Sequence, residues 1–193
     1  MGVVFRQALA DPYAEDITLR PRFLALPHTQ LTINDMHFSQ RDRNGRLLAF
    51  MARAAQRPEP RVAVVNENVS THEGGGALLA EDVNVDAASY PTVYGVGVDQ
   101  ATALLVYPNG TSSIVGSGSS FLLKLDGDTP RKCVEGAPLS IARVEAYCID
   151  AAYADTSSFD FATWRGVGGL NYSYAVVNGS YVGSPYGPSC RSM

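Results

Sequence analysis

The sequence predicts an α/β unit at its N-terminal end, followed by a β-rich antiparallel half. Three observations support this prediction. Residues 31–37 alternate at period two, residues 40–57 repeat at the period of a helix, and residues 93–193 contain short β-branched and aromatic runs separated by turn formers. A chain of 193 residues with 46% hydrophobic residues can bury one sizeable core, so we expect a single domain.

The first predicted strand covers residues 31–37. Every second position of this segment is occupied by Leu31, Ile33, Asp35 or His37. Because alternate side chains of a strand point to the same face, this pattern predicts that Asp35 and His37 share one face at the C-terminal end of the strand.

An amphipathic helix is predicted over residues 40–57. Its apolar positions fall within one arc at 100° per residue, and Pro58 ends it. Ser39 followed by Asp42 resembles a helix cap. Of the arginines in this region, Arg43 lies at the edge of the apolar arc and is predicted to point inward.

The remainder divides into a long irregular region and a β-rich part. Residues 1–60 form the strand–helix part, and residues 61–92, apart from a strand over 61–65, read as an insertion or long surface loop. The β-rich part, 93–193, contains these predicted strands: 93–98, 103–107, 113–115, 120–125, 141–149, and a hairpin of 172–177 with 181–182.

Composition excludes some classes of function. The net charge of −4 and the pI near 5.3 argue against nucleic acid and anionic membranes as partners, because both require a basic face. No apolar run reaches the length of a membrane span, and the first residues lack the pattern of a signal peptide. We predict no cofactor, since the glycines around Gly95 and Gly116 lack a complete phosphate-binding pattern.

The cysteines and the glycosylation sequons do not decide whether the protein is secreted. Cys133, Cys148 and Cys190 lack metal-type spacing, so no metal site is predicted, and they form either one disulfide and a free thiol or three thiols. Four sequons suggest secretion, although their asparagines also suit turns: Asn68, Asn109, Asn171 and Asn178.

The strongest candidate for chemistry is His37. Histidine side chains in general can act as a base near neutral pH, and the arginines that follow His37 offer planar cationic groups for carboxylates. The competing interpretation is that His37 caps the helix or satisfies core hydrogen bonds while the arginines form a solvated face. No G-x-S-x-G elbow is present, so the chain shows no recognisable nucleophile.

Two segments carry a resemblance to a known family. Residues 37–46 match the pattern H-F-x-x-R-x-R-x-G-R, and residues 94–103 are similar to G-x-G-x-D-E-x-T-A. Both patterns are typical of the cyanophycinase-like serine peptidases. The resemblance implies a class I glutamine-amidotransferase-like, flavodoxin-like α/β fold with a Ser-His-Glu triad. It also implies hydrolysis of acidic or β-linked Asp-Arg peptides.

Carried over to this chain, the resemblance makes His37 the general base and places Gln100 at the position of the triad acid. It assigns substrate binding, to a peptide with carboxylate groups, to four residues: Asp35, Arg41, Arg43 and Arg46. The serine of the family belongs to an N-terminal half that we expect to be missing here, so residues 1–193 would be a single incomplete domain, inactive in isolation. The missing half or a homo-oligomer would complete it.

The alternative from another class of protein is a non-catalytic, secreted, β-rich binding module derived from the same family. In this interpretation Gln100 marks the loss of activity. The ten tyrosines of the chain, several of them after residue 150, would line a ligand surface, although they equally suit strand packing.

Overall fold

The computed structural model describes residues 3–15, 17, 19, 27–56, 90–188 and 190. This part of the chain forms two α-helices, one 3₁₀ turn and eleven strands. The helical elements are α1 (Val3–Ala10), α2 (Asn44–Ala55) and η1 (Ala151–Tyr153). The strands are β1 (Thr32–Met36), β2 (Val93–Val98), β3 (Thr102–Val106), β4 (Thr111–Gly116), β5 (Ser119–Leu125), β6 (Arg131–Lys132), β7 (Ser140–Asp150), β8 (Ser158–Asp160), β9 (Arg165–Val167), β10 (Leu170–Val177) and β11 (Ser180–Val182).

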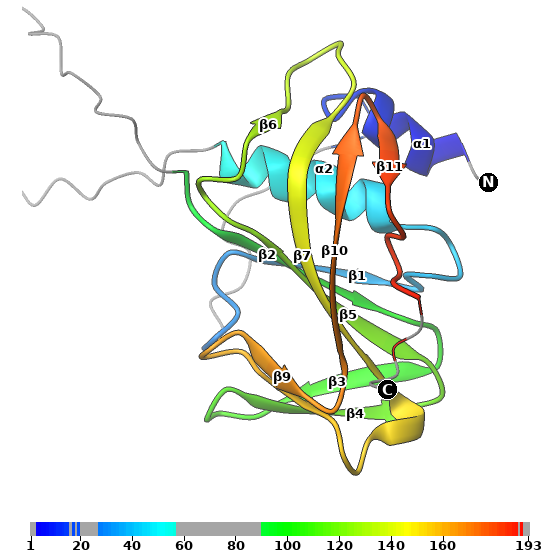
Figure 1. Ribbon diagram of the computed structural model, residues 1–193, viewed down its shortest axis with the longest axis vertical. Coiled ribbons are helices and arrows are strands. Elements are labelled where there is room, and N and C mark those ends of the chain that lie inside the picture. The colour runs from blue at the N-terminus through cyan, green and yellow to red at the C-terminus, as the bar shows by residue number, and fades with distance from the viewer. Residues whose placement is uncertain are drawn as a thin grey trace, which may run out of the picture.

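Two sheets organise these strands. The large sheet has the order β1-β2-β5-β7-β10-β11, with β6 added to β7, and the small sheet has the order β3-β4-β8-β9. Strands β1 and β2 pair in parallel, and every other pairing of the described strands is antiparallel. In Figure 1 the small sheet lies at the lower end of the molecule, and α2 crosses the upper half behind β7 and β10.

The large sheet has a buried core on each face, although parts of β7, β10 and β11 are exposed. On one face Leu47, Leu48 and Met51 of α2 belong to the main core. On the other face Leu122 of β5 packs in a second core with Phe159 of the small sheet. Alternation along β5 explains the division, because successive side chains of a strand point to opposite faces. The result is three layers: helix, large sheet and small sheet.

Glycines in β2 permit close approach on the helix side of the sheet. A Cβ added at Gly95 would lie 2.6 Å from Met51 Sδ, and one at Gly97 would lie 2.3 Å from the Phe38 ring. Neither distance is tolerated by real side chains, so only glycine lets α2 and the loop before it lie directly on β2. This contact positions the residues around His37.

The predicted α/β, class I glutamine-amidotransferase-like fold is wrong. Such a fold alternates parallel strands with helices that cover both faces of the sheet. Here the described strands include one parallel pair, and the face opposite α2 is covered by an antiparallel sheet. A parallel connection needs a crossover, usually a helix, and after α2 the described residues form no further α-helix.

The individual strands predicted for the β-rich part are present in the structure. The structure confirms the antiparallel β-rich part over 93–182, with each predicted strand present to within two residues at its ends, and the hairpin β10–β11 turns at Asn178–Gly179. It adds α1, β6, β8 and β9, which are too short or too irregular to show a clear period. The predicted strand over 61–65 and most of the predicted insertion over 61–92 lie outside the described residues.

The predicted helix begins four residues later than expected. Helix α2 covers Asn44–Ala55, and Arg43 at its N-cap makes no capping hydrogen bond through its side chain. The predicted cap at Ser39 is therefore wrong. His37 and Asp42 both have positive φ angles, 52° and 49°, so the chain turns twice before it can become helical.

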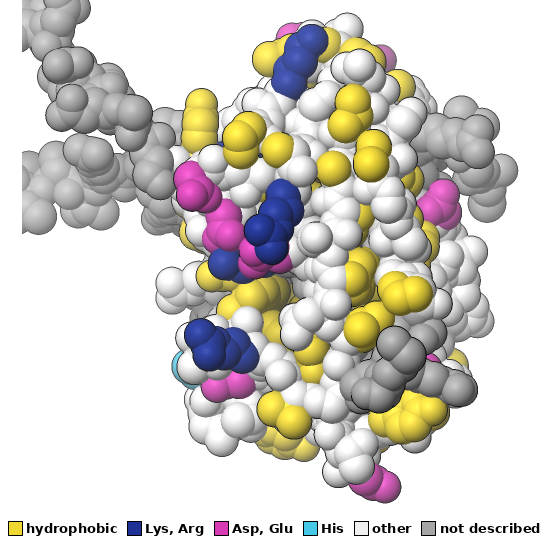
Figure 2. Space-filling model, in the orientation of Figure 1, with side chains coloured by type: hydrophobic (Ala, Val, Ile, Leu, Met, Phe, Trp, Pro, Cys, Tyr) yellow, Lys and Arg dark blue, Asp and Glu magenta, His cyan; other side chains and the backbone are white. Residues whose placement is uncertain are grey.

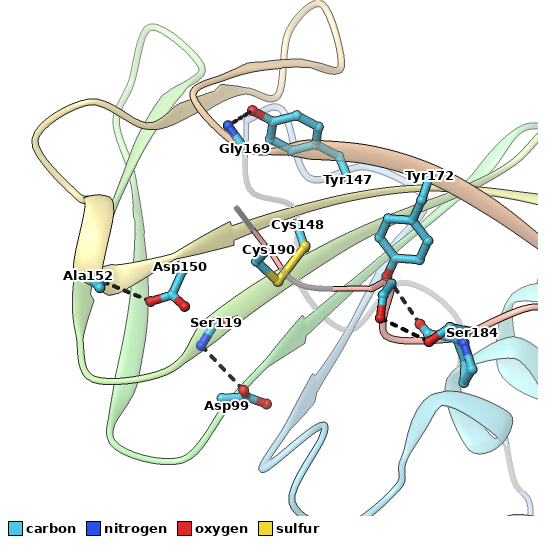
Figure 3. The surroundings of a disulfide bond; sticks show 12 residues. Asp99, Ser119, Tyr147, Cys148, Asp150, Ala152, Gly169, Tyr172, Ser184 and Cys190 are labelled. Atoms are coloured by element: carbon cyan, nitrogen blue, oxygen red, sulfur yellow. Dashed lines mark hydrogen bonds between the residues drawn. A yellow bond between two sulfur atoms is a disulfide. The ribbon is translucent and has the colours of Figure 1, made fainter. Parts of the chain in front are cut away.

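A disulfide closes the end of the chain onto the large sheet. Cys148 of β7 is bonded to Cys190, with the two Cα atoms 5.2 Å apart (Figure 3), and Cys133 is a buried free thiol. Of the two alternatives left by the sequence, the structure has one disulfide and one thiol. Such bonds form and persist in oxidising compartments.

Replacing Cys190 by Ser should lower the free energy of unfolding by about 4 kcal/mol, since the disulfide closes a loop with a sequence separation of 42. Urea unfolding followed by circular dichroism measures this loss. The native protein in dithiothreitol should unfold at the same urea concentration as the variant. A native protein that is unaffected by the reductant would contradict the prediction.

Candidate functional site

The candidate site lies at the end of the parallel pair of strands, where His37 follows β1. His37 is partly buried and has a φ of 52°, in the left-handed region that is uncommon for residues other than glycine. Because β1 ends at Met36, the predicted alternation does not reach His37. The turn, and not the strand, therefore sets the direction of the imidazole.

Backbone hydrogen bonds attach this turn to β2. The Phe38 N–H donates to the Val98 carbonyl (3.1 Å), and the Ser39 N–H donates to Asp99 Oδ1 (2.9 Å). Asp99 Oδ2 also accepts the Ser119 N–H at 3.3 Å, as Figure 3 shows. The buried Asp99 carboxylate thus connects the turn, the end of β2 and the start of β5.

Asp35 forms ion pairs with two of the three arginines of the motif. Its side chain lies on the α2 side of β1 and accepts hydrogen bonds from Arg43 Nη1 (3.1 Å), from Arg46 Nε (2.9 Å) and from Arg46 Nη2. The Asp35 side chain is 5% exposed, against 16% for Arg43 and 27% for Arg46. Arg43, as predicted, points inward. A buried carboxylate held between two guanidinium groups stabilises the entry to α2.

Arg41 differs from the other two arginines. It is exposed, and it forms no ion pair with any residue that the structure describes. Its backbone N–H donates to the His37 carbonyl at 3.2 Å, which places Arg41 one turn after the histidine. Of the motif arginines, Arg41 is the most exposed, so its guanidinium is the most accessible to a dissolved carboxylate.

The His37 ring is not part of a triad within the described residues. Its Nδ1 is buried and has no hydrogen-bond partner there. Gln100, at the position of the family's acid, is exposed, and its backbone N–H donates to Gln40 Oε1 (3.0 Å). The neighbouring Asp99 carboxylate accepts two backbone N–H groups instead of the imidazole.

No described serine or cysteine side chain is hydrogen-bonded to the His37 ring. Ser120 is fully buried, with its Oγ unpartnered among the described residues. Burial raises the pKa of the Cys133 thiol to about 11, so this cysteine is protonated at neutral pH. His28 is exposed and contacts the Pro108 carbonyl. His72 lies outside the described residues.

Tyr186 supports the turn that carries His37, and the sequence did not predict this role. Its ring packs edge-on against Phe38 and Phe121, with centroids 5.7 and 5.6 Å away. Its hydroxyl donates to Asp42 Oδ1 (2.9 Å) and accepts the Asn44 N–H (3.3 Å). Tyr186 therefore holds both ends of the turn that carries His37. The abundance of tyrosine near the C-terminus was the only signal in the sequence.

Tyr186 lies near three other tyrosines of the C-terminal part, and burial changes the pKa of all four. Burial raises the pKa of Tyr172, Tyr174, Tyr181 and Tyr186 well above the ordinary value of 10. The phenols remain protonated in the folded protein at a pH where those of the unfolded chain begin to ionise. Their contribution to stability is complete below pH 10 and is lost as the pH rises further.

A small cavity opens elsewhere, between the two sheets. It has a volume of about 70 Å³, and its lining includes Tyr147, Trp164, Lys124, Glu145 and Asn171. On the face drawn in Figure 2, basic and acidic side chains lie next to each other above an apolar hollow. The ion pairs of the large sheet, Lys124 with Asp126 and Arg143 with Glu145, are of this mixed kind.

Comparisons with known proteins add no family assignment. No family model and no curated protein matches the chain. Within the described residues, no group of three metal-ligating side chains comes together, and no helix has the length and apolarity to cross a membrane. The roles predicted for His37, Gln100, Asp35 and the arginines of the motif stay predictions.

Replacing Tyr186 by Phe should lower the free energy of unfolding by about 1–2 kcal/mol, because the ring contacts remain while Asp42 and Asn44 lose their partner. Urea unfolding measures the loss, and the NMR signal of the His37 ring should move. Tyr107→Phe is the matched control: its exposed hydroxyl contacts Ser113 Oγ, and its loss should cost less than about 0.5 kcal/mol. Equal losses in both variants would refute the role of Tyr186.

Proposed function

We propose that this chain supplies the general base and a substrate-binding arginine of a cyanophycinase-like serine peptidase that acts on acidic or β-linked Asp-Arg peptides. The observation that carries the proposal is the position of the His37 ring together with its unpartnered Nδ1. Its ring follows the end of a parallel strand pair, directly before the arginines of the motif, and its buried Nδ1 has no partner in the described part of the chain. The proposal concerns this site and not the fold that the resemblance implied.

The chemistry requires two further groups. In serine hydrolysis the imidazole takes the serine proton and later gives it to the leaving amine, while a carboxylate on its other nitrogen stabilises the imidazolium. Gln100 stands where the family has that carboxylate, and an amide cannot stabilise the imidazolium by charge. The corresponding change of a triad aspartate to an amide lowers the rate about 10⁴-fold.

Substrate recognition falls mainly to Arg41. Arg43 and Arg46 are both ion-paired to Asp35, and removing them from that carboxylate would leave a buried charge without a partner. Arg41 is exposed and its backbone is hydrogen-bonded to His37. We therefore assign Arg41 to the substrate carboxylate, and we assign Asp35, Arg43 and Arg46 to support of the turn.

The chain alone should release no dipeptide from a β-linked Asp-Arg polymer, because His37 has neither a serine nor a carboxylate partner within the described residues. Chromatography of the soluble products measures release, with a cyanophycinase as the positive control. Release by the native chain that is abolished in His37→Ala would contradict this expectation.

The β-Asp-Arg dipeptide should nevertheless bind beside His37. Titration should shift the His37 ring signal in NMR spectra, which His37→Ala identifies among the three histidines. Arg41→Ala should weaken binding about tenfold or more, as expected for a lost hydrogen bond between charged groups. Arg143→Ala should bind normally, since Arg143 lies toward the opposite end of the large sheet by strand register. If the chemical shift of the His37 ring does not change at millimolar dipeptide, the proposed site is excluded.

A second candidate function, the non-catalytic binding module, is favoured by a different observation. The cavity between the sheets combines the aromatic rings of Tyr147 and Trp164 with the polar side chains of Lys124, Glu145 and Asn171. Cavities lined by aromatic rings and a few polar groups commonly bind small ligands, and at about 70 Å³ this one has room only for a group much smaller than a drug-sized ligand. A ligand that shifts the Trp164 indole signal and leaves His37 unchanged would favour this function.

A further inference from the structure

Three of the four sequons fall within the described residues, and their asparagines are all exposed: Asn109, Asn171 and Asn178. Exposure alone does not distinguish them. Their local geometry does, because the three occupy different kinds of backbone and make different hydrogen bonds.

Asn109 lies at the tip of the hairpin between β3 and β4. Its side-chain Oδ1 accepts the Thr111 N–H (3.1 Å) and the Thr111 hydroxyl (2.7 Å). The two residues that define the sequon are therefore in direct contact. Because Oδ1 points back into the turn, Nδ2 points away from it, and Nδ2 has no hydrogen-bond partner among the described residues.

The other two sequons lack this arrangement. Asn171 lies within β10, opposite Tyr147, and its side chain borders the cavity between the sheets. Asn178 occupies a tight turn with a φ of 48°, where its backbone N–H donates to Ser140 Oγ (3.0 Å). Neither asparagine is hydrogen-bonded to the hydroxyl two positions later in the described structure.

The surface beside Asn109 is apolar. Strand β3 is an edge of the small sheet, and next to the hairpin tip Leu105 and Tyr107 are exposed by 44% and 46%, while Val115, farther along the same hairpin, is exposed by 46%. An exposed apolar edge strand invites pairing with other chains unless something bulky covers it. A glycan at the hairpin tip would provide such cover and would be held in solvent.

From these observations we infer that Asn109 is a site of N-linked glycosylation, with a lipid-pyrophosphate-linked oligosaccharide as the donor. The Asn109 Nδ2 forms a bond to the anomeric carbon of the first sugar, and the bond from that carbon to the pyrophosphate oxygen breaks. The lipid pyrophosphate leaves with the electron pair, and Nδ2 gives one proton to the transferase. The disulfide between Cys148 and Cys190 belongs to the same oxidising, secretory environment.

The test is expression of the full chain behind a secretory leader in cultured insect or mammalian cells. Treatment with peptide N-glycosidase in H₂¹⁸O converts each glycosylated asparagine to a labelled aspartate, which peptide mass spectrometry locates. We expect the label at residue 109, and we expect Asn109→Gln and Thr111→Ala to remove one glycan from the intact mass. Asn171→Gln is the matched control and should leave that glycan in place.

Two outcomes would overturn the inference. One is an unlabelled Asn109 in secreted protein that has formed the disulfide, since that protein has passed through the compartment of the transferase. The other is retention of the Asn109 glycan in Thr111→Ala, which would remove the role of the hydroxyl. Both variants change exposed residues, and the disulfide reports that each protein has folded.

Discussion

The buried carboxylate of Asp99 is the interaction on which the rest of the site depends. It accepts the backbone N–H groups of Ser39 and Ser119, and the Asp99 N–H donates to the Ser119 carbonyl. Three segments distant in sequence meet there: the turn after β1, the end of β2 and the start of β5. Leaving a buried N–H group without an acceptor costs about 1–3 kcal/mol, and for these partly buried groups the same cost, in part, favours a carboxylate at this interior position.

The position of the turn determines what surrounds it. With Ser39 held by Asp99, Phe38 lies against Gly97, and Asp42 and Asn44 lie within reach of Tyr186. Tyr186 belongs to a terminal segment that the disulfide at Cys190 attaches to β7. The site is thus assembled from segments far apart in the sequence, and its geometry depends on burial and covalent closure as much as on the motif itself.

The motif contains residues of two kinds. Asp35 forms ion pairs with Arg43 and Arg46 and supports the entry to α2, whereas the His37 ring and the exposed Arg41 guanidinium have no ion-pair or hydrogen-bond partner among the described residues. A motif that resembles a catalytic site therefore includes supporting charges. Only the second kind is available to a ligand, which is why the proposed chemistry rests on His37 and Arg41.

The sequence by itself determined the strands of the β-rich part, the amphipathic helix and the location of His37 at a strand end, because period and turn chemistry are local properties. Tertiary structure decided the rest. Strand partners and the second sheet depend on contacts between distant residues, so the order of the strands and the disulfide of Cys148 could not be read from periodicity. The left-handed turn at His37 and the contact of Tyr186 likewise follow from long-range packing, to which no local pattern corresponds.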